Sequence, residues 1–414
     1  MKIGTLPVLT AIFAIGQLDR HVLSISLNQL GLEFDLSDLQ LGLLSGLVFA
    51  LVFVLFGFPV AILAAHGNRR NIVAASAFFW SAMTIVMGAA QNFTHLVVAR
   101  LGVGIGEAGA VAPAHSMISD LYPPERRTSA MATFSVGANI GVLLAFLIGG
   151  IVGQAFGWRW AFVIAGIPGL FLAAILRFAT DEPKHVVGLQ EPVTKGSLFM
   201  ATLRTMLSDK GLVHACCAVS VTGIVTFGAL AWNPTFLIRV HGFSQAEAGI
   251  ILAIGIGLFG GAGTWASGRL ADRLGRRDAR WRFGIVIVCI LVGKICVFGI
   301  LLFDNATASI ASFFGAAGLA GVFWGPTFAH LHMRMPGAMR PMATAIFLFA
   351  FNLGGLGFGP TLIGFLSDRG EIHFGADALR YAIVVIQCFG FWGAWHYWRV
   401  IRTMTADQPQ TIRA

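Results

Sequence analysis

The sequence predicts an all-α membrane protein with twelve transmembrane helices in two six-helix bundles and both termini in the cytoplasm. Three observations predict this fold class: the composition, a series of twelve apolar segments and an internal repeat. Of the 414 residues, 57% are hydrophobic and only 11% are charged. A soluble domain carries about 25% charged residues and could not bury this much apolar surface. Disorder is excluded too, because it requires low hydrophobicity and high charge.

Apolar segments follow one another along the whole chain. A transmembrane helix needs roughly 20 apolar residues. The first such segment is not a cleaved signal peptide, because it is too long and carries Asp19, Arg20 and His21. In chain order the segments span about 5–30, 39–65, 72–91, 95–117, 129–155, 159–179, 212–238, 247–268, 283–303, 306–330, 342–366 and 378–401.

The distribution of basic residues predicts the topology. With the N-terminus inside, 21 of the 28 lysines and arginines fall in cytoplasmic segments, as the positive-inside rule requires. The net charge of +9 does not indicate nucleic-acid binding, because the basic residues lie in short loops between apolar segments. The longest connection, 180–211, is polar and is interpreted as a cytoplasmic linker between an N-terminal bundle (1–179) and a C-terminal bundle (212–414).

The two halves repeat. A shift of 207 residues lays the loop 61–70 on the loop 268–277. A duplicated six-helix unit with parallel topology is typical of secondary transporters built from two bundles. A shift of 213 lays one set of residues on another of the same type: Arg127, Phe134, Asn139 and Gly141 on Arg340, Phe347, Asn352 and Gly354.

The loop 268–277, Gly-Arg-Leu-Ala-Asp-Arg-Leu-Gly-Arg-Arg, resembles the signature loop of the major facilitator superfamily. Its first copy departs from the pattern at Ala65, His66 and Asn68. The resemblance implies the major facilitator fold, with two bundles around a central cavity, and a loop that stabilises one orientation of that cavity. The alternative is that these charges only set the topology. The residues of this conformational-switch loop are Gly268, Asp272, Arg273, Gly275, Arg276 and Arg277, with Arg69 and Arg70 in the first copy.

Within that superfamily, the N-terminal half is similar to the spinster-like transporters. The resemblance is carried by Asp19-Arg20, by Phe79-Trp80-Ser81-Ala82, by the segment 100–108 and by the segment 120–127. It implies transport of lysophospholipids or sphingoid lipids with proton coupling, and it places the chemistry near Asp19, Arg20, Arg100 and Glu107. Short loops favour a bacterial member, in the cytoplasmic (inner) membrane.

The four ionisable residues also stand out without the resemblance. Of 19 acidic residues, only Asp19 and Glu107 lie deep within predicted spans, where a charge costs at least ~2.5–3.5 kcal/mol and marks a cavity or an ion path. Arg100 and Glu107 are two helical turns apart and share a face. We predict Glu107 and Asp19 as proton-coupling residues, with Arg100 as the partner of Glu107, and Arg20 and Arg100 as anion-binding residues. A static ion pair between helices is the structural alternative.

The C-terminal half offers a different surface. No acidic residue and no arginine lies deep in its spans, so Phe227, Trp232 and Phe351 are predicted to contact an apolar part of the substrate. Lys294 lies near the middle of the ninth segment, where snorkelling of its flexible stem is as plausible as a function.

No enzyme is indicated. The sequence has no phosphate loop, no HExxH and no GxSxG, and its five cysteines lack metal-ligand spacing, so neither a cofactor nor a metal is expected. We predict a monomeric, proton-coupled secondary transporter of an amphiphilic, anionic, lipid-like substrate, surrounded by membrane lipids. The alternatives are a carrier of small organic anions or drugs, and a membrane lipid sensor or scaffold without transport.

Overall fold

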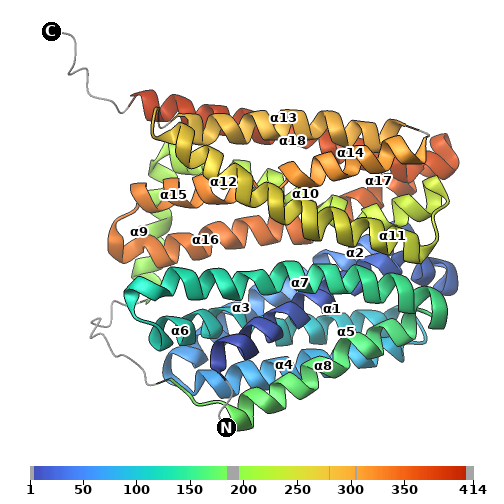
Figure 1. Cartoon of the computed structure of the whole chain (residues 1–414), viewed down its shortest axis with the longest axis horizontal. Coiled ribbons are helices and arrows are strands. Elements are labelled where there is room, and N and C mark those ends of the chain that lie inside the picture. Colours follow the sequence, from blue (N-terminus) through green and yellow to red (C-terminus); the bar gives the residue numbers. More distant parts are fainter. Residues whose placement is uncertain (1–3, 184–194, 279, 304, 407–414) are drawn as a thin grey trace. The chain divides into compact units, whose positions relative to one another are not determined.

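The computed structural model describes residues 4–183, 195–278, 280–303 and 305–406, and within these ranges every regular element is a helix (Figure 1). Eleven helical runs in the described chain are long and apolar enough to cross a membrane. The predicted all-α, multi-span class is therefore confirmed.

The first half contains eight helices for six predicted segments, because two segments are divided. Gly46 leaves the helical conformation, with φ −111° and ψ −93°, and separates α2 from α3. The chain also breaks at residues 108–110, between α5 and α6. The helices are α1 (Thr5–Phe34), α2 (Asp38–Ser45), α3 (Leu47–His66), α4 (Arg69–Gly88), α5 (Phe93–Glu107), α6 (Val111–Leu121), α7 (Pro124–Phe156) and α8 (Trp158–Ala179).

The second half begins with a helix that the sequence analysis did not predict. Helix α9 lies within the predicted linker and packs against α16, and its Thr202 and Met206 are buried. The elements are α9 (Lys195–Ser208), α10 (Lys210–His241), α11 (Gln245–Leu252), the π-helical η1 (Ala253–Gly260), α12 (Gly261–Gly275), α13 (Trp281–Leu302), α14 (Ala306–Leu319), α15 (Trp324–Arg334), η2 (Gly337–Met339), α16 (Arg340–Asn352), the π-helical η3 (Leu353–Phe358), α17 (Gly359–Phe374), η4 (Gly375–Asp377) and α18 (Ala378–Ala406).

The repeat is visible at helix starts. Ser37 and Gln40 form a capping box at the N-terminus of α2, in which each side chain accepts a hydrogen bond from the backbone of the other residue. Ser244 and Glu247 form the same box at the N-terminus of α11. Ser244 and Glu247 each lie 207 residues after their counterparts in the first box. This is the same shift that aligns the two loops in the sequence.

A second pair of equivalent contacts follows the shift of 213. The Nε atom of Arg127 donates to the carbonyl of Tyr122 at 3.0 Å, and the Nε atom of Arg340 donates to the carbonyl of Met335 at 3.1 Å. The preceding helices, α6 and α15, are 11 residues long in both halves and start 213 residues apart. The internal repeat thus extends from residue identities to individual hydrogen bonds.

The chain packs as two compact units. Unit 1 comprises Met1–Gly188, Ala229–Gly257 and Pro360–Ala382, and unit 2 comprises Leu189–Gly228, Leu258–Gly359 and Ile383–Ala414. In unit 1, α1 packs along α7 and α8, and α8 along α4 (Figure 1). In unit 2, α13 packs along α14 and α12. Unit 1 therefore includes all of α11 and parts of α10, η1, α17 and α18, which belong to the second half of the sequence.

Candidate functional site

A buried ion pair joins α1 to the end of α5. Nε of Arg20 donates to Oε2 of Glu107, and the two side chains expose only 13% and 4% of their surface. The sequence analysis gave Glu107 a different partner, Arg100, on the same helix face. The hydrogen-bonded partner is Arg20, which approaches from the neighbouring helix, whereas Arg100 lies seven residues, or about 10 Å along the helix axis, from Glu107 and acts on it through its charge.

Arg100 lies instead against an aromatic ring. Its guanidinium carbon is 4.5 Å from the ring centre of Phe49, and that of Arg20 is 5.0 Å from the same ring. Phe53, one turn further along α3, stacks on Phe49 and also lies 4.9 Å from Arg20. Nε and Nη1 of Arg100 are buried and have no hydrogen-bond partner within the described chain. A guanidinium with free donors in a dry environment is a strong potential ligand for an anion.

Asp19 completes the group of charges. Its side chain exposes 1% of its surface, and neither carboxylate oxygen has a hydrogen-bond partner among the described residues. It lies near Thr84 and Trp80 of α4 and near the carboxylate of Glu107. The structure thus brings together all four ionisable residues that the sequence analysis selected in the N-terminal half.

A small, mainly apolar cleft opens beside the ion pair, and Glu107 forms part of its wall. The break between α5 and α6 contributes to this wall, with α1, α4 and α7. Glu107 Oε1 is buried without a hydrogen-bond partner in the described chain. The cleft therefore combines one charged position with an apolar lining. Its larger apolar and amide side chains are Leu9, Ile12, Phe13, Gln17, Trp80 and Phe134.

The three aromatic residues predicted in the C-terminal half do not form one group. In unit 2, the ring centre of Phe351 lies 5.3 Å from that of Phe227 and 4.7 Å from that of Trp324. Trp232 belongs to unit 1, where it is fully buried and donates to the carbonyl of Pro360 at 2.9 Å. The structure therefore pairs Phe227 with Phe351 and places Trp232 elsewhere.

A polar cluster that the sequence analysis missed joins α2 to α17 and α10. The backbone N–H groups of Asp38 and Leu39 donate to the two carboxylate oxygens of Asp368 at 2.8 and 2.9 Å. Ser367 donates to the Asp38 carboxylate at 2.6 Å, and Nη1 of Arg239 donates to it at 2.7 Å. A carboxylate at a helix N-terminus is favoured by the free N–H groups and the helix dipole. We call these five residues the α2 latch.

Helices α7 and α11 meet at glycines in the same unit. A Cβ atom on Gly249 would collide with the carbonyl of Phe146 and approach Cα of Gly150, so this close contact needs a glycine. Beside it, the amide of Gln245 donates to the carbonyl of Gly149 at 2.8 Å. Together with the α2 latch, this contact ties the second half of the sequence to the first within unit 1.

Comparison with known proteins identifies the family. The family model described as Major Facilitator Superfamily matches residues 9–310. The chain belongs to this superfamily. It is 30% identical to an MFS-type efflux pump of Mycolicibacterium smegmatis over 94% of this chain and 90% of that protein. It is 28% identical to a sphingosine-1-phosphate transporter of Xenopus tropicalis, over 85% of this chain and 71% of that protein.

The fold is also similar to that of a solved structure from the spinster branch of the superfamily. A bacterial homologue of the human lysosomal transporter Spinster, solved in an inward-facing and unoccupied conformation, superposes with a TM-score of 0.86, 27% identity and 98% coverage of both chains. The resemblance inferred from the sequence is confirmed. Within the superfamily the chain is similar to spinster-like transporters; it is a multi-pass integral membrane protein, and no catalytic family is indicated.

The first copy of the superfamily's signature loop holds a dense polar network, although its sequence is degenerate. Arg69 is buried, and its guanidinium donates to Glu182 and Ser116 at 2.9 Å each and also to Asp120. The backbone N–H of Arg70 donates to the other oxygen of Glu182 at 2.7 Å. Glu182 was missed because it follows α8, over 110 positions from its partner in the sequence, and carries no motif.

The second copy of the signature loop lies at the end of α12, and its arginine side chains are more exposed to solvent than Arg69 of the first copy. Arg273, Arg276 and Arg277 are exposed. A Cβ atom on Gly268 would meet nothing within 4 Å, whereas one on Gly275 would press on the Arg282 side chain. The side chain of Asp272 lies outside the described part of the chain.

Lys294 does not reach the surface. It exposes 7% of its surface, and its ammonium group donates to the side-chain carbonyl of Gln387 in α18. The snorkelling interpretation is therefore wrong for this structure, and Lys294 links α13 to α18.

Proposed function

We propose that the protein is a proton-coupled transporter of an amphiphilic, anionic, lipid-like substrate. The observation that carries this proposal is the buried Arg20–Glu107 pair, of which Glu107 lines a mainly apolar cleft. A mainly apolar cleft beside a buried ion pair suits a molecule with a charged headgroup and an acyl chain. The name of the sphingosine-1-phosphate relative and the spinster resemblance support the same substrate class.

The ion pair supplies a coupling mechanism. Burial favours the neutral form of Glu107, whereas the Arg20 guanidinium favours its carboxylate. An anionic headgroup that binds Arg20 displaces Glu107, which then takes up a proton. When the headgroup leaves, Arg20 pairs with Glu107 again and the proton is released. Substrate and proton thus compete for one site, and this competition links their movements.

The neighbouring residues have supporting roles in this proposal. Arg100, with two unpaired donors, completes a fork for a phosphate or carboxylate headgroup. Asp19, buried beside Thr84 and Trp80, is the second proton-carrying position, as ionisable residues within membrane spans commonly are. Phe227 and Phe351 are proposed to contact the acyl chain. Trp232 stays in the proposed substrate set, although its indole group is fully buried in this conformation.

The α2 latch is proposed to close the outer side of the transporter. The run Met342–Met404 is 63 residues long, enough for two crossings, so the eleven apolar runs are proposed to make twelve. The positive-inside rule then places both termini inside. In this topology the α2 latch and the α7–α11 contact lie at the outer ends of their helices, and both must break when the protein opens outward.

We propose two six-helix bundles, 1–179 and 212–414, joined by the linker 180–211, in a monomer of a bacterial inner membrane.

The two signature loops lie at the cytoplasmic ends of their helices in this topology, opposite the α2 latch. We propose that they stabilise one orientation of the central cavity. Arg69 and Arg70 tie α4 to α6 and to the segment after α8. The second copy, with Asp272 as its acidic residue, is proposed to act in the same way on the other bundle.

We keep as the rival function a carrier of drugs or small organic anions, which the similarity to an efflux pump favours.

The test uses purified protein in liposomes with an imposed pH gradient and a fluorescent lysophospholipid as substrate. Glu107→Gln mimics the protonated acid, so it should still bind the lipid but lose the response of flux to the gradient. Glu371→Gln, an exposed carboxylate of α17, is the matched control and should behave as the unchanged protein. If Glu107→Gln responds normally, the coupling role moves to Asp19. If no variant, nor the unchanged protein, moves the lipid, the drug or small-anion carrier is favoured.

A further inference from the structure

The aromatic ring of Phe49, in α3, contacts both arginines of the candidate site. Its centre lies 5.0 Å from the guanidinium carbon of Arg20 and 4.5 Å from that of Arg100. The ring is fully buried and stacks on Phe53, so packing restricts its orientation. A cation near an aromatic face is attracted by the negative charge of that face, most strongly where water is excluded. One ring therefore attracts two guanidinium groups that come from different helices.

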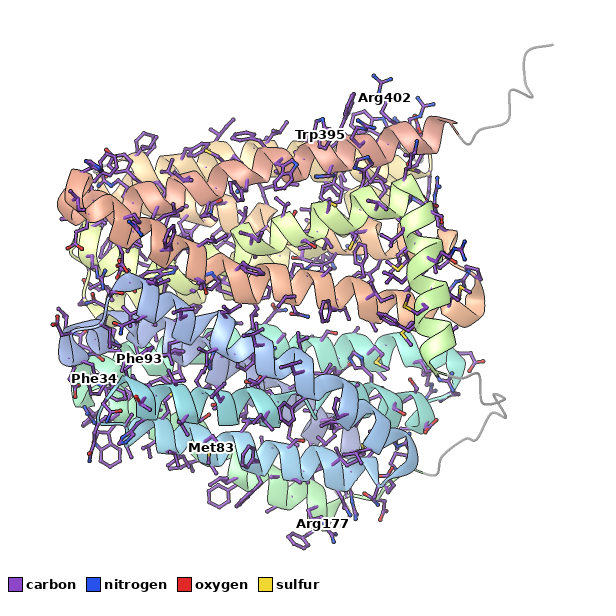
Figure 2. The ribbon with its side chains drawn as sticks, turned by 180° about the vertical axis from the view of Figure 1, so that it is seen from behind. Phe34, Met83, Phe93, Arg177, Trp395 and Arg402 are labelled. Atoms are coloured by element: carbon purple, nitrogen blue, oxygen red, sulfur yellow. The ribbon has the colours of Figure 1, made fainter. Side chains whose placement is uncertain are left out.

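A close approach of α3 and α5 brings the ring to this position. The two helices pack side by side in unit 1, and Figure 2 marks the start of α5 at Phe93. They approach most closely at Gly104, one turn after Arg100. A Cβ atom on Gly104 would collide with Cγ2 of Val52 and lie 3.1 Å from the carbonyl oxygen of Phe49. The glycine thus lets the backbone of α3 come close enough for Phe49 to reach Arg100.

The ring also compensates a buried positive charge. Glu107 accepts a hydrogen bond from Arg20, whereas Nε and Nη1 of Arg100 have no hydrogen-bond partner within the described chain. Arg100 nevertheless exposes only 2% of its surface, and a buried cation costs free energy unless its surroundings compensate the charge. An aromatic ring stabilises the charge without accepting a pair of hydrogen bonds, as a carboxylate would. The donors of Arg100 consequently stay available to an anion.

We propose that Phe49 is the positioning residue of the anion site: it holds Arg20 and Arg100 so that both guanidinium groups present donors to one anionic group. A phosphate or a carboxylate fits, because each accepts paired N–H groups from a guanidinium. The role rests on the proposed function in one respect, that a transported anion binds these two arginines. It holds for an anionic lipid and for a small organic anion alike.

Fluorinated phenylalanines at position 49 test the proposal, because each added fluorine atom weakens the negative face of the ring and nearly keeps its shape. Dissociation constants are measured by isothermal titration of the purified protein, with lysophosphatidylglycerol and benzoate as separate probes. The affinity should fall with each fluorine atom. Phe49→Leu removes the ring and keeps an apolar side chain, so it should lower the affinity roughly fivefold to a hundredfold, because two arginine side chains must then be ordered on binding.

Phe162 is the matched control. It lies in the same unit, exposes 1% of its surface and packs 5.9 Å from the ring centre of Trp158. The same fluorinated series at position 162 should leave the affinity unchanged. Thermal unfolding of each variant checks that it is folded.

The two probes separate failure of the positioning role from failure of the lipid proposal. If lysophosphatidylglycerol binds equally well across the Phe49 series, the positioning role is overturned and the lipid substrate stands. If only benzoate binds and its affinity falls across the series, the positioning role stands and the lipid substrate falls. An equal decline in the Phe162 series, or an unchanged protein that binds neither probe, would overturn the positioning role.

Discussion

Charged residues within apolar spans are conspicuous in a sequence, but their partners are not. Asp19, Arg20, Arg100 and Glu107 could be selected because a charge in a membrane span needs a reason. The pairing of Glu107 could not be predicted, because helix periodicity shows which residues share a face and says nothing about the helix opposite. Phe49, which lies under both arginines, could not be found either, since α3 is apolar on all sides and no position stands out.

The corrected pairing predicts a coupling energy between Arg20 and Glu107. Arg20→Gln leaves a buried carboxylate without its partner and should destabilise the protein by about 3–5 kcal/mol. Adding Glu107→Gln should recover much of this loss, because two neutral side chains then face each other. The double-mutant cycle is measured by unfolding of the purified protein in detergent. The Arg100–Glu107 cycle is the comparison, and its coupling should be smaller, because Arg100 acts on Glu107 through its charge whereas Arg20 also donates a hydrogen bond to it. A larger coupling for Arg100 than for Arg20 would identify Arg100 as the main partner of Glu107.

At the scale of elements, hydropathy predicts where spans lie and says little about how they end or break. The interruption at 108–110 has an equivalent after α14, and Asn92 and Asn305 cap α5 and α14 at positions 213 apart. Polar caps at apolar segments could be read from the sequence. Helix α9 could not, because its 14 residues are too polar for a span and it packs against α16 only through contacts made in the folded chain.

Asp209 gives an element-scale prediction that depends on pH. Burial raises the pKa of this carboxyl group, but hydrogen bonds from Arg334 and from the backbone N–H groups of Leu212 and Gly211 outweigh it and hold the pKa below its usual value. A depressed pKa stabilises the fold above the unfolded value, about 3.9, and this stability is lost as the pH falls through the folded pKa. Asp209→Asn keeps a cap for α10 and removes the ion pair, so it should cost about 0.2–1 kcal/mol at pH 7.

The measurement is thermal unfolding in detergent from pH 7 to pH 3. The difference between the unchanged protein and Asp209→Asn should shrink below pH 4. Asp209→Ala should cost about 1 kcal/mol more than the asparagine variant, because it also loses the cap. A difference that stays constant over the whole range would show that the carboxylate is not titrating in this interaction.

At the scale of the whole molecule, the duplication could be predicted and the distribution of residues between the two packed units could not. Residues 213 apart share types because the halves share a fold. By contrast, the contacts that bring α11 and parts of α10 and α17 into unit 1 join residues such as Asp38 and Asp368, which are 330 positions apart and carry no shared pattern. These contacts belong to one conformation of a transporter that has at least two. Because the sequence encodes both conformations, it does not indicate which contacts are present in either one.

The α2 latch therefore predicts a conformational equilibrium. Asp368→Asn keeps the size of the side chain but removes the charge that the N-terminus of α2 favours, so the latch should weaken by about 0.3–1 kcal/mol, up to about 2 in a partly buried position. The population open to the outside should rise by the corresponding factor of about two to thirty. Spin labels at Leu32 and Ile372, which expose 79% and 87% of their surface and lie outside the latch, report the change as a longer distance. Asp377→Asn is the control, because its ion pair with Arg380 is local to one turn. If the distance between the spin labels increases in both variants, or in neither, then the α2 latch does not control the outward opening and is only a static contact.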